Sequence, residues 1–232
     1  MKLTIVGLGG IGSHLLLPLI QYLNFENNIF EEIWFIDGDK YEEKNIKRQH
    51  VTAMDNKATS QVKYYRDMFK NITLMSVDSY ITPDNIHKVV ADGDVVLLCV
   101  DNNKTRKLFE DYFEKVDNLT VISGGNELYD GNIMITQKVK GEFTSRKFSE
   151  LHPELAEPSD KSPHEMSCEE LSVSSPQISI VNATVADLMR RTLYAMMAGR
   201  GINYDEIFVN CSSGMEKAVL NENIKERLVI KK

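Results

Sequence analysis

Residues 3–12 read LTIVGLGGIG, an apolar, β-rich run that ends in closely spaced glycines. The residues that follow, GSHLLLPLIQYL (12–23), have the pattern of a helix, in which Pro18 predicts a kink. Glycines at a strand-to-helix turn let the backbone approach phosphate oxygens, and the helix N-terminus supplies N–H groups without intrahelical partners. The stretch therefore predicts a nucleotide-binding turn, whose glycines are Gly7, Gly9, Gly10 and Gly12.

The first half of the chain repeats this alternation of strand and helix, which is typical of a doubly wound, parallel sheet. The run DVVLLCVD (94–101) is almost continuously apolar, as expected for a central parallel strand. The predicted fold class is therefore α/β, Rossmann-like and doubly wound, with a mainly parallel sheet. We expect further strands at 33–37, 73–78 and 119–123, and helices at 57–69, 83–91 and 103–116.

After residue 125 the pattern changes. The segments GNIMITQKV (131–139) and IFVNC (207–211) predict antiparallel C-terminal strands, the second being the last strand of the chain. Residues 141–174 carry few large apolar groups and are too long for an ordinary connection, so we expect a functional crossover loop there. A long helix is expected over about 175–198. No linker divides the chain, so we expect one domain (1–232), with a nucleotide-binding half (1–125) and a second half (126–232).

The composition is that of an ordinary globular protein, with 42% hydrophobic and 26% charged residues. The formal net charge of -7 argues against non-specific attraction to nucleic acid or to an anionic membrane. No signal peptide and no membrane-spanning run is visible, so we expect a cytoplasmic protein. The cysteines form no CxxC pair, which argues against a disulfide framework and against structural zinc.

Asp37 ends the second predicted strand, where a carboxylate can accept hydrogen bonds from ribose hydroxyls. To this point the pattern fits a nicotinamide-dependent dehydrogenase equally well. However, the segment DGDKYEEKNIKRQ (37–49) and the helix after it bring two cations, Arg48 and Lys57, to the predicted site. An enzyme that splits ATP between its α- and β-phosphates needs such cations, because charge grows on the leaving pyrophosphate. Arg48 and Lys57 are our candidates for that role.

The order DxD, NxxRQ and Lys, preceded by GxGGxGS, resembles the ThiF/MoeB/E1 family of adenylyltransferases over residues 1 to about 125. The resemblance implies an enzyme that binds ATP with Mg²⁺ and the Gly-Gly tail of a ubiquitin-like or sulfur-carrier protein. The tail carboxylate would attack the α-phosphate, giving an acyl-adenylate and pyrophosphate. The resemblance also implies a homodimer. Besides the glycines, the residues it places at the nucleotide are Asp37, Asp39, Asn45, Arg48, Gln49 and Lys57.

Asp101 closes the predicted central strand. The carboxyl end of such a strand is where open α/β sheets bind ligands. The resemblance assigns Asp101 to the magnesium ion on the triphosphate, a role that suits a hard cation with one or two carboxylate ligands. The alternative is that Asp101 caps the helix predicted at 103–116, and the two roles are compatible.

Cys168 lies at the place where the resemblance puts a crossover-loop cysteine, shortly before a long helix. Some family members use this cysteine to form a thioester or an acyl disulfide, and others keep it without needing it. A helix N-terminus would favour its thiolate, whereas neighbouring glutamates would oppose it, so its participation stays open. Cys99 and Cys211 lie in or beside predicted strands and are expected to be inert.

The sequence departs from the family at its start, since family members usually carry helices before the first strand, including an arginine that reaches the partner subunit's ATP. Three alternatives to the main hypothesis remain. These are an E1-like tRNA-modifying dehydratase acting on a nucleoside carboxylate, a dehydrogenase, and a non-catalytic E1-like scaffold. The net charge weighs against tRNA, a dehydrogenase would tolerate loss of Arg48 or Lys57, and a scaffold would not need all the predicted site residues together.

Overall fold

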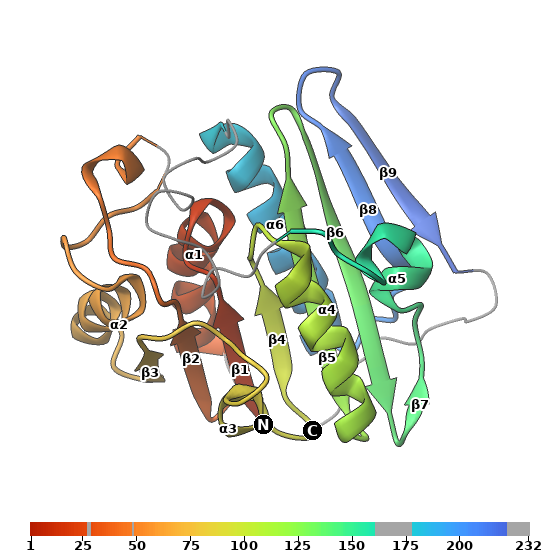
Figure 1. Cartoon of the computed structure of the whole chain (residues 1–232). Coiled ribbons are helices and arrows are strands. Elements are labelled where there is room, and N and C mark those ends of the chain that lie inside the picture. The colour runs from red at the N-terminus through yellow and green to blue at the C-terminus, as the bar shows by residue number, and fades with distance from the viewer. Residues whose placement is uncertain (27–28, 48, 161–177, 222–232) are drawn as a thin grey trace.

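The computed structural model describes residues 1–26, 29–47, 49–160 and 178–221. This described part contains one nine-stranded sheet with the order β3-β2-β1-β4-β5-β6-β8-β9, and β7 pairs with β6 (Figure 1). The strands from β3 to β5 are parallel, and those from β6 onward are antiparallel. This mixed topology confirms the predicted fold class. The strands are β1 (Lys2–Val6), β2 (Glu32–Ile36), β3 (Thr73–Val77), β4 (Val95–Leu98), β5 (Leu119–Asn126), β6 (Asp130–Val139), β7 (Glu142–Phe143), β8 (Tyr204–Asn210) and β9 (Met215–Leu220).

Helices cover both faces of the sheet, and none in the described ranges is both long enough and apolar enough to span a bilayer. The α-helices are α1 (Gly10–Glu26), α2 (Lys57–Met68), α3 (Ile86–Val89), α4 (Asn103–Tyr112), α5 (Phe148–Leu151) and α6 (Ser179–Met197). The described residues also form three short 3₁₀ helices, η1 (Glu43–Asn45), η2 (Phe113–Lys115) and η3 (Pro153–Leu155).

The central strand β4 is buried on both faces because its side chains alternate between two hydrophobic cores. Val95 and Leu97 join the core shared with α1, α2 and α6, whereas Val96 and Leu98 join the core shared with α3 and α4. A parallel strand in this position can hold the site at its carboxyl end rigidly, since both of its faces are packed.

The long helix α6 packs against α1 and against the strands β5 and β6. Val181, Val185, Leu188 and Leu193 are buried on it and form its apolar face toward the core. The helix begins at Ser179, and the first residues of the predicted helix lie outside the described ranges.

Two predictions about the second half are wrong. The beginning of the expected crossover loop (141–174) is not a plain loop, because β7, α5 and η3 form there, with Phe148 and Leu155 buried in the core beside α4. The segment 207–211 is not the last strand either, because β8 begins at Tyr204 and a further strand, β9, pairs with it. Residues 161–174 of the predicted loop lie outside the described ranges.

Candidate functional site

A cleft of roughly 1370 Å³ opens at the carboxyl ends of the parallel strands. It extends from the glycine turn after β1 and the loops after β2 and β3, past the start of α4, to the β5–β6 hairpin and the α5–η3 segment. Strand β1 lies between β2 and β4, so the chain winds outward in two directions from this point. The cleft therefore lies at the topological switch point, where open α/β sheets bind ligands.

Each of the four predicted glycines is required, or tolerated, for a different structural reason. Gly7 has a positive φ of 83°, and a Cβ on Gly12 would lie 2.1 Å from the Gly7 carbonyl oxygen. A Cβ on Gly10 would lie 2.5 Å from the Asn182 Nδ2 atom of α6, whereas one on Gly9 would meet nothing closer than 3.9 Å. A side chain on Gly7, Gly10 or Gly12 would thus clash with the rest of the protein. Gly9 alone leaves its α-carbon open to the cleft that it lines.

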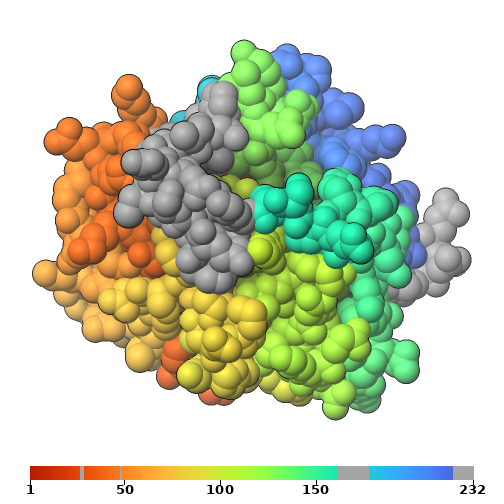
Figure 2. Space-filling model, in the orientation of Figure 1, coloured from red at the N-terminus to blue at the C-terminus, as the bar shows by residue number. Residues whose placement is uncertain are grey.

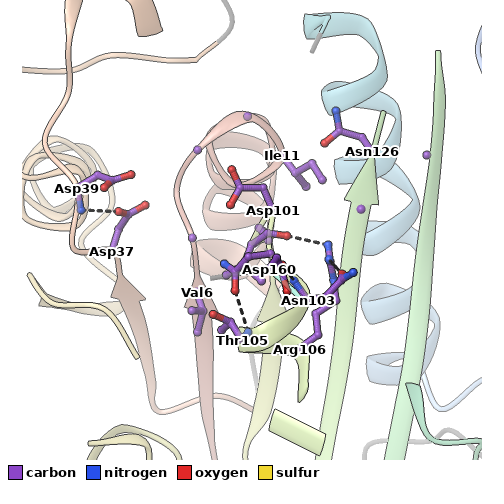
Figure 3. A pocket seen from close by; sticks show the side chains of 18 of the residues that line it. Val6, Ile11, Asp37, Asp39, Asp101, Asn103, Thr105, Arg106, Asn126 and Asp160 are labelled. Atoms are coloured by element: carbon purple, nitrogen blue, oxygen red, sulfur yellow. Dashed lines mark hydrogen bonds between the residues drawn. The ribbon is translucent and has the colours of Figure 1, made fainter. Parts of the chain in front are cut away.

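Asp37 binds the glycine turn to the end of β2 (Figure 3). Its Oδ2 accepts a hydrogen bond from the Leu8 N–H at 2.6 Å, and its Oδ1 accepts one from the Asp39 N–H at 2.8 Å. Burial raises the pKa of the Asp37 carboxyl, and the ammonium of Lys57 opposes this shift. In the structure the Asp37 carboxylate holds the backbone of Leu8 and Asp39 in place. Its predicted contact with ribose stays a prediction.

Lys57 starts helix α2, and its buried side chain forms an ion pair with the partly exposed Asp39, with 2.7 Å between the Lys57 Nζ and the Asp39 Oδ2. Burial lowers the pKa of the Lys57 ammonium, but Asp37 and Asp39 outweigh it and raise the pKa overall. Burial likewise raises the pKa of the Asp39 carboxyl, and its contacts with Lys57 and Tyr80 more than reverse that shift. The structure thus keeps a positive charge in the wall of the cleft. The sequence does not single out Tyr80, whose only signal is its place just beyond the carboxyl end of β3.

Asn45, the last residue of η1, and Gln49 line the cleft. The Asn45 Oδ1 accepts a hydrogen bond from the Glu42 N–H at 2.8 Å, so this side chain closes a tight turn. The Gln49 Oε1 is buried and has no hydrogen-bond partner in the described ranges. An orphaned polar atom beside a cleft is expected where a ligand completes the hydrogen bonding. Arg48, between these two residues, lies outside the described residues.

Asp101 lies in the middle of the cleft view, just beyond the end of β4 (Figure 3). The alternative that Asp101 caps α4 is wrong, because Asn102 is the N-cap and its Oδ1 accepts the Thr105 N–H at 2.8 Å. The Asp101 side chain is exposed, and no hydrogen bond or ion pair joins it to a described residue. Its carboxylate is therefore available to a ligand.

The residues of the cleft fit ATP with Mg²⁺. Gly9, just before α1, and Gly10, its first residue, line the cleft at the N-terminus of that helix, as a phosphate site requires. The described part holds no cluster of three potential metal ligands. A single carboxylate suits Mg²⁺ on a nucleotide, because this ion keeps several waters and takes the remaining oxygens from phosphates. Asp101 would be that ligand, and the buried, unpartnered Asn102 Nδ2 adds a donor in the same wall.

Arg106 is a buried cation in the first turn of α4, and Figure 3 shows it in the same cleft view as Asp101. Its guanidinium donates to the Asn103 Oδ1 at 2.7 Å, the Ser123 Oγ at 3.2 Å and two backbone carbonyls. Burial lowers its pKa, and the charges of Asp101 and Asp160 oppose that shift. Among the described carboxylates none forms an ion pair with it. Arg106 therefore adds positive potential to the cleft beside the β5–β6 hairpin.

The α5–η3 segment lies beside α4 (Figure 2) and lines the cleft at His152, Glu154 and Leu155. A buried carboxylate on β8 fastens it, since the Glu206 Oε1 lies 2.6 Å from the His152 Nε2 and accepts a hydrogen bond from the Asn132 Nδ2 at 2.6 Å. The hydrogen bond to Glu206 raises the pKa of His152. The sequence gives no signal for this contact, because its partners are far apart in the chain.

Replacing His152 with glutamine is expected to remove a pH-dependent part of the stability. The His152 pKa is raised in the folded state, so its contribution is complete below the ordinary value of 6.5 and is lost as the pH rises through the folded pKa. Urea unfolding of the wild type and of His152→Gln between about pH 6 and pH 9 measures this. The wild type should be more stable at the acidic end, and the difference should shrink toward the alkaline end. A difference that stays constant with pH would contradict the prediction.

Of the two described cysteines, Cys99 lines the cleft and Cys211 does not. Burial raises the pKa of the Cys99 thiol to about 12, so this thiol stays protonated and inert. The Cys211 Sγ lies 3.6 Å from the Thr184 Oγ1 beside α6. Cys168 lies outside the described residues.

Comparison with known proteins gives a family match over nearly the whole chain: the ThiF family model matches residues 1–226. The chain is 30% identical over 134 residues to the SAMP-activating enzyme E1 of Haloferax volcanii, covering 56% of this chain and 47% of that enzyme. It is 31% identical over 114 residues to the adenylyltransferase and sulfurtransferase uba4 of Aspergillus clavatus, covering 47% of this chain and 22% of that protein. The matched part thus spans less than half the length of either relative.

Solved structures show the same fold. Crystal structures of E. coli MccB with MccA and of PaaA superpose with TM-scores of 0.69 and 0.68, at 18% and 16% identity. Each covers 94% of this chain, which in turn covers 63% of either neighbour. At this level of identity the likeness concerns the fold alone.

Proposed function

Because this chain belongs to the ThiF family, we propose that it uses ATP and Mg²⁺ to adenylate the C-terminal carboxylate of a ubiquitin-like or sulfur-carrier protein. The homologues are named as an activating enzyme and as adenylyltransferases, which removes the dehydrogenase alternative. The acceptor, the cofactors and the partners proposed for this chain follow from that family together with the chemistry of its cleft.

The observation that carries the proposal is the unengaged carboxylate of Asp101 at the centre of the cleft. It lies near the glycine turn, and its negative charge favours the protonated forms of Lys57 and Arg106, although burial still lowers the pKa of Arg106 overall. A carboxylate that has no partner in the described part and lies near cations suits a divalent ion that arrives with an anionic ligand, because such a ligand balances the remaining charge.

Each residue then has a defined task. Gly9 lets the triphosphate approach the N–H groups at the start of α1, and Asp37 keeps that turn fixed. Asp101 holds Mg²⁺, which would neutralise negative charge on the phosphates. Lys57 and Arg48 stabilise the leaving pyrophosphate. The acceptor carboxylate is already ionised, so the protein contributes mainly by positioning and charge stabilisation.

We place the acceptor tail between the β5–β6 hairpin and the α5–η3 segment, because the cleft continues there beyond Asp101. The tail would end in Gly-Gly, and the enzyme would act as a homodimer in the cytoplasm. Transfer of the activated acyl group to Cys168 is a further step that this proposal allows without requiring it.

ATP–pyrophosphate exchange with Mg²⁺ tests the proposal. The acceptors are a panel of small proteins that end in Gly-Gly, each compared with the same protein carrying a C-terminal amide. We expect exchange with at least one free tail and none with its amide, because the amide has no carboxylate to activate.

The outcomes separate the alternatives. Binding of MgATP without exchange for any tail would contradict the proposed acceptor and favour the tRNA-modifying or scaffold alternative. Failure to bind MgATP at all would contradict the proposed cofactor.

A further inference from the structure

The loop after β3 carries Tyr80, whose side chain reaches across to the end of β2. Its hydroxyl donates a hydrogen bond to the Asp39 Oδ1. Its ring lies directly on Gly38, where a Cβ would come within 2.7–2.8 Å of three ring carbons. Only glycine therefore fits between Asp37 and Asp39 while Tyr80 keeps this place.

Asp39 is shared between Tyr80 and the cation of the cleft. Tyr80 bonds to one carboxylate oxygen, and the Lys57 Nζ lies 2.7 Å from the other. The backbone of Asp39 is also fixed, since its N–H donates to the Asp37 Oδ1 at 2.8 Å and its carbonyl accepts the Lys57 N–H at 2.9 Å. The Asp39 side chain is consequently held at both oxygens and on both sides along the chain.

This arrangement determines where the Lys57 ammonium lies. The Lys57 side chain is only 7% exposed, but the residue lines the cleft. An ammonium has three N–H donors, and one of them is bonded to Asp39 in the described part. The other donors can reach a ligand only if Asp39 keeps its orientation, and Tyr80 is the second group that fixes it.

Tyr80 can keep this role across the physiological pH range. Burial raises the pKa of its hydroxyl, and the hydrogen bond and negative charge of Asp39 raise it further. The hydroxyl therefore stays a donor. The proposed adenylation gives Tyr80 no role of its own, so its hydrogen bond to Asp39 needs another explanation.

We propose that Tyr80 is a positioning residue for the triphosphate: through Asp39, its hydroxyl holds the Lys57 ammonium where the phosphates of the bound nucleotide lie. The inference rests on the proposed binding of ATP. It separates two parts of the side chain, because the hydroxyl acts on Lys57, whereas the ring supports Gly38 and the wall of the cleft.

The test compares Tyr80→Phe with the wild type by calorimetric titration of MgATP and of AMP. Loss of a hydrogen bond to a charged group should weaken MgATP binding about fivefold to tenfold. AMP lacks the outer phosphates, so its affinity should change by less than about twofold. Tyr64→Phe is the matched control, because Tyr64 is exposed on α2, its ring contacts those of His50 and Tyr65, and it is not among the residues that line the cleft. It should leave both affinities unchanged.

A second measurement repeats the substitution in a Lys57→Met background. Since Tyr80 acts through Lys57, Tyr80→Phe should cause no further loss of MgATP affinity there. The inference is overturned if Tyr80→Phe binds MgATP as the wild type does, if MgATP and AMP lose affinity equally, or if the loss persists without Lys57. If the wild type itself fails to bind MgATP, the proposed function fails instead.

Discussion

Asp101→Asn is expected to abolish ATP–pyrophosphate exchange and to leave the protein folded. The carboxylate forms no hydrogen bond or ion pair with a described residue, and Asn102 caps α4 in its place. The substitution therefore removes the proposed ligand for Mg²⁺ without removing a hydrogen bond or ion pair within the described part of the protein. Loss of a charge that stabilises the reacting phosphates should lower the exchange rate about 100-fold or more.

The matched control is Asp84→Asn, because Asp84 is an exposed carboxylate in the turn before α3 and does not line the cleft. It should retain wild-type exchange. Thermal unfolding should show both variants within about 2 °C of the wild type. Exchange by Asp101→Asn at the wild-type rate would contradict the proposed metal ligand, whatever the acceptor.

Gly12→Ala is expected to lower the stability of the protein, whereas Gly9→Ala is expected to lower its affinity for MgATP. A Cβ on Gly12 would lie 2.1 Å from the Gly7 carbonyl oxygen, so the turn must open to admit it. We expect a loss of about 3 kcal/mol in the free energy of unfolding, which is a decrease of roughly 6–12 °C in Tm for a chain of this size.

A Cβ on Gly9 meets nothing closer than the Gln49 Nε2 at 3.9 Å, so Gly9→Ala should unfold within about 2 °C of the wild type. Its methyl group would stand where the phosphates approach the α1 N-terminus, and MgATP affinity should fall about tenfold or more. Calorimetry and thermal unfolding of both variants check the pair. If Gly9→Ala binds MgATP normally, the triphosphate does not lie on this turn.

The family and the parallel half of the fold could be predicted from the sequence, and both predictions are confirmed. The reason is physical: β1 and β4 are buried between two helical layers, so their apolar runs are continuous and easy to recognise. The glycine turn is equally local, since Gly7 and Gly12 contact each other across only five residues.

The rest of the site depends on contacts between distant parts of the chain. The ion pair of Lys57 joins residues 18 apart, and the contact of His152 with Glu206 joins residues 54 apart. No periodic pattern records such pairings. The cap predicted for α4 was Asp101, whereas Asn102 forms it, because both residue types are good N-caps and the residue type alone does not separate them.

The strand β9 escaped prediction because its residues are almost all exposed, so no alternation of apolar and polar side chains marks it. Within the described ranges it pairs with β8 alone, which leaves a row of backbone N–H and C=O groups along its other side. Such a row is a template for strands of other molecules and a route to aggregation. Glu216 and Lys217 place opposite charges on this strand, and Glu216 is anchored to Arg191 of α6 at 2.6 Å. The same polar side chains that concealed the strand therefore protect the protein's solubility, because they discourage the sheet from growing into a neighbouring molecule.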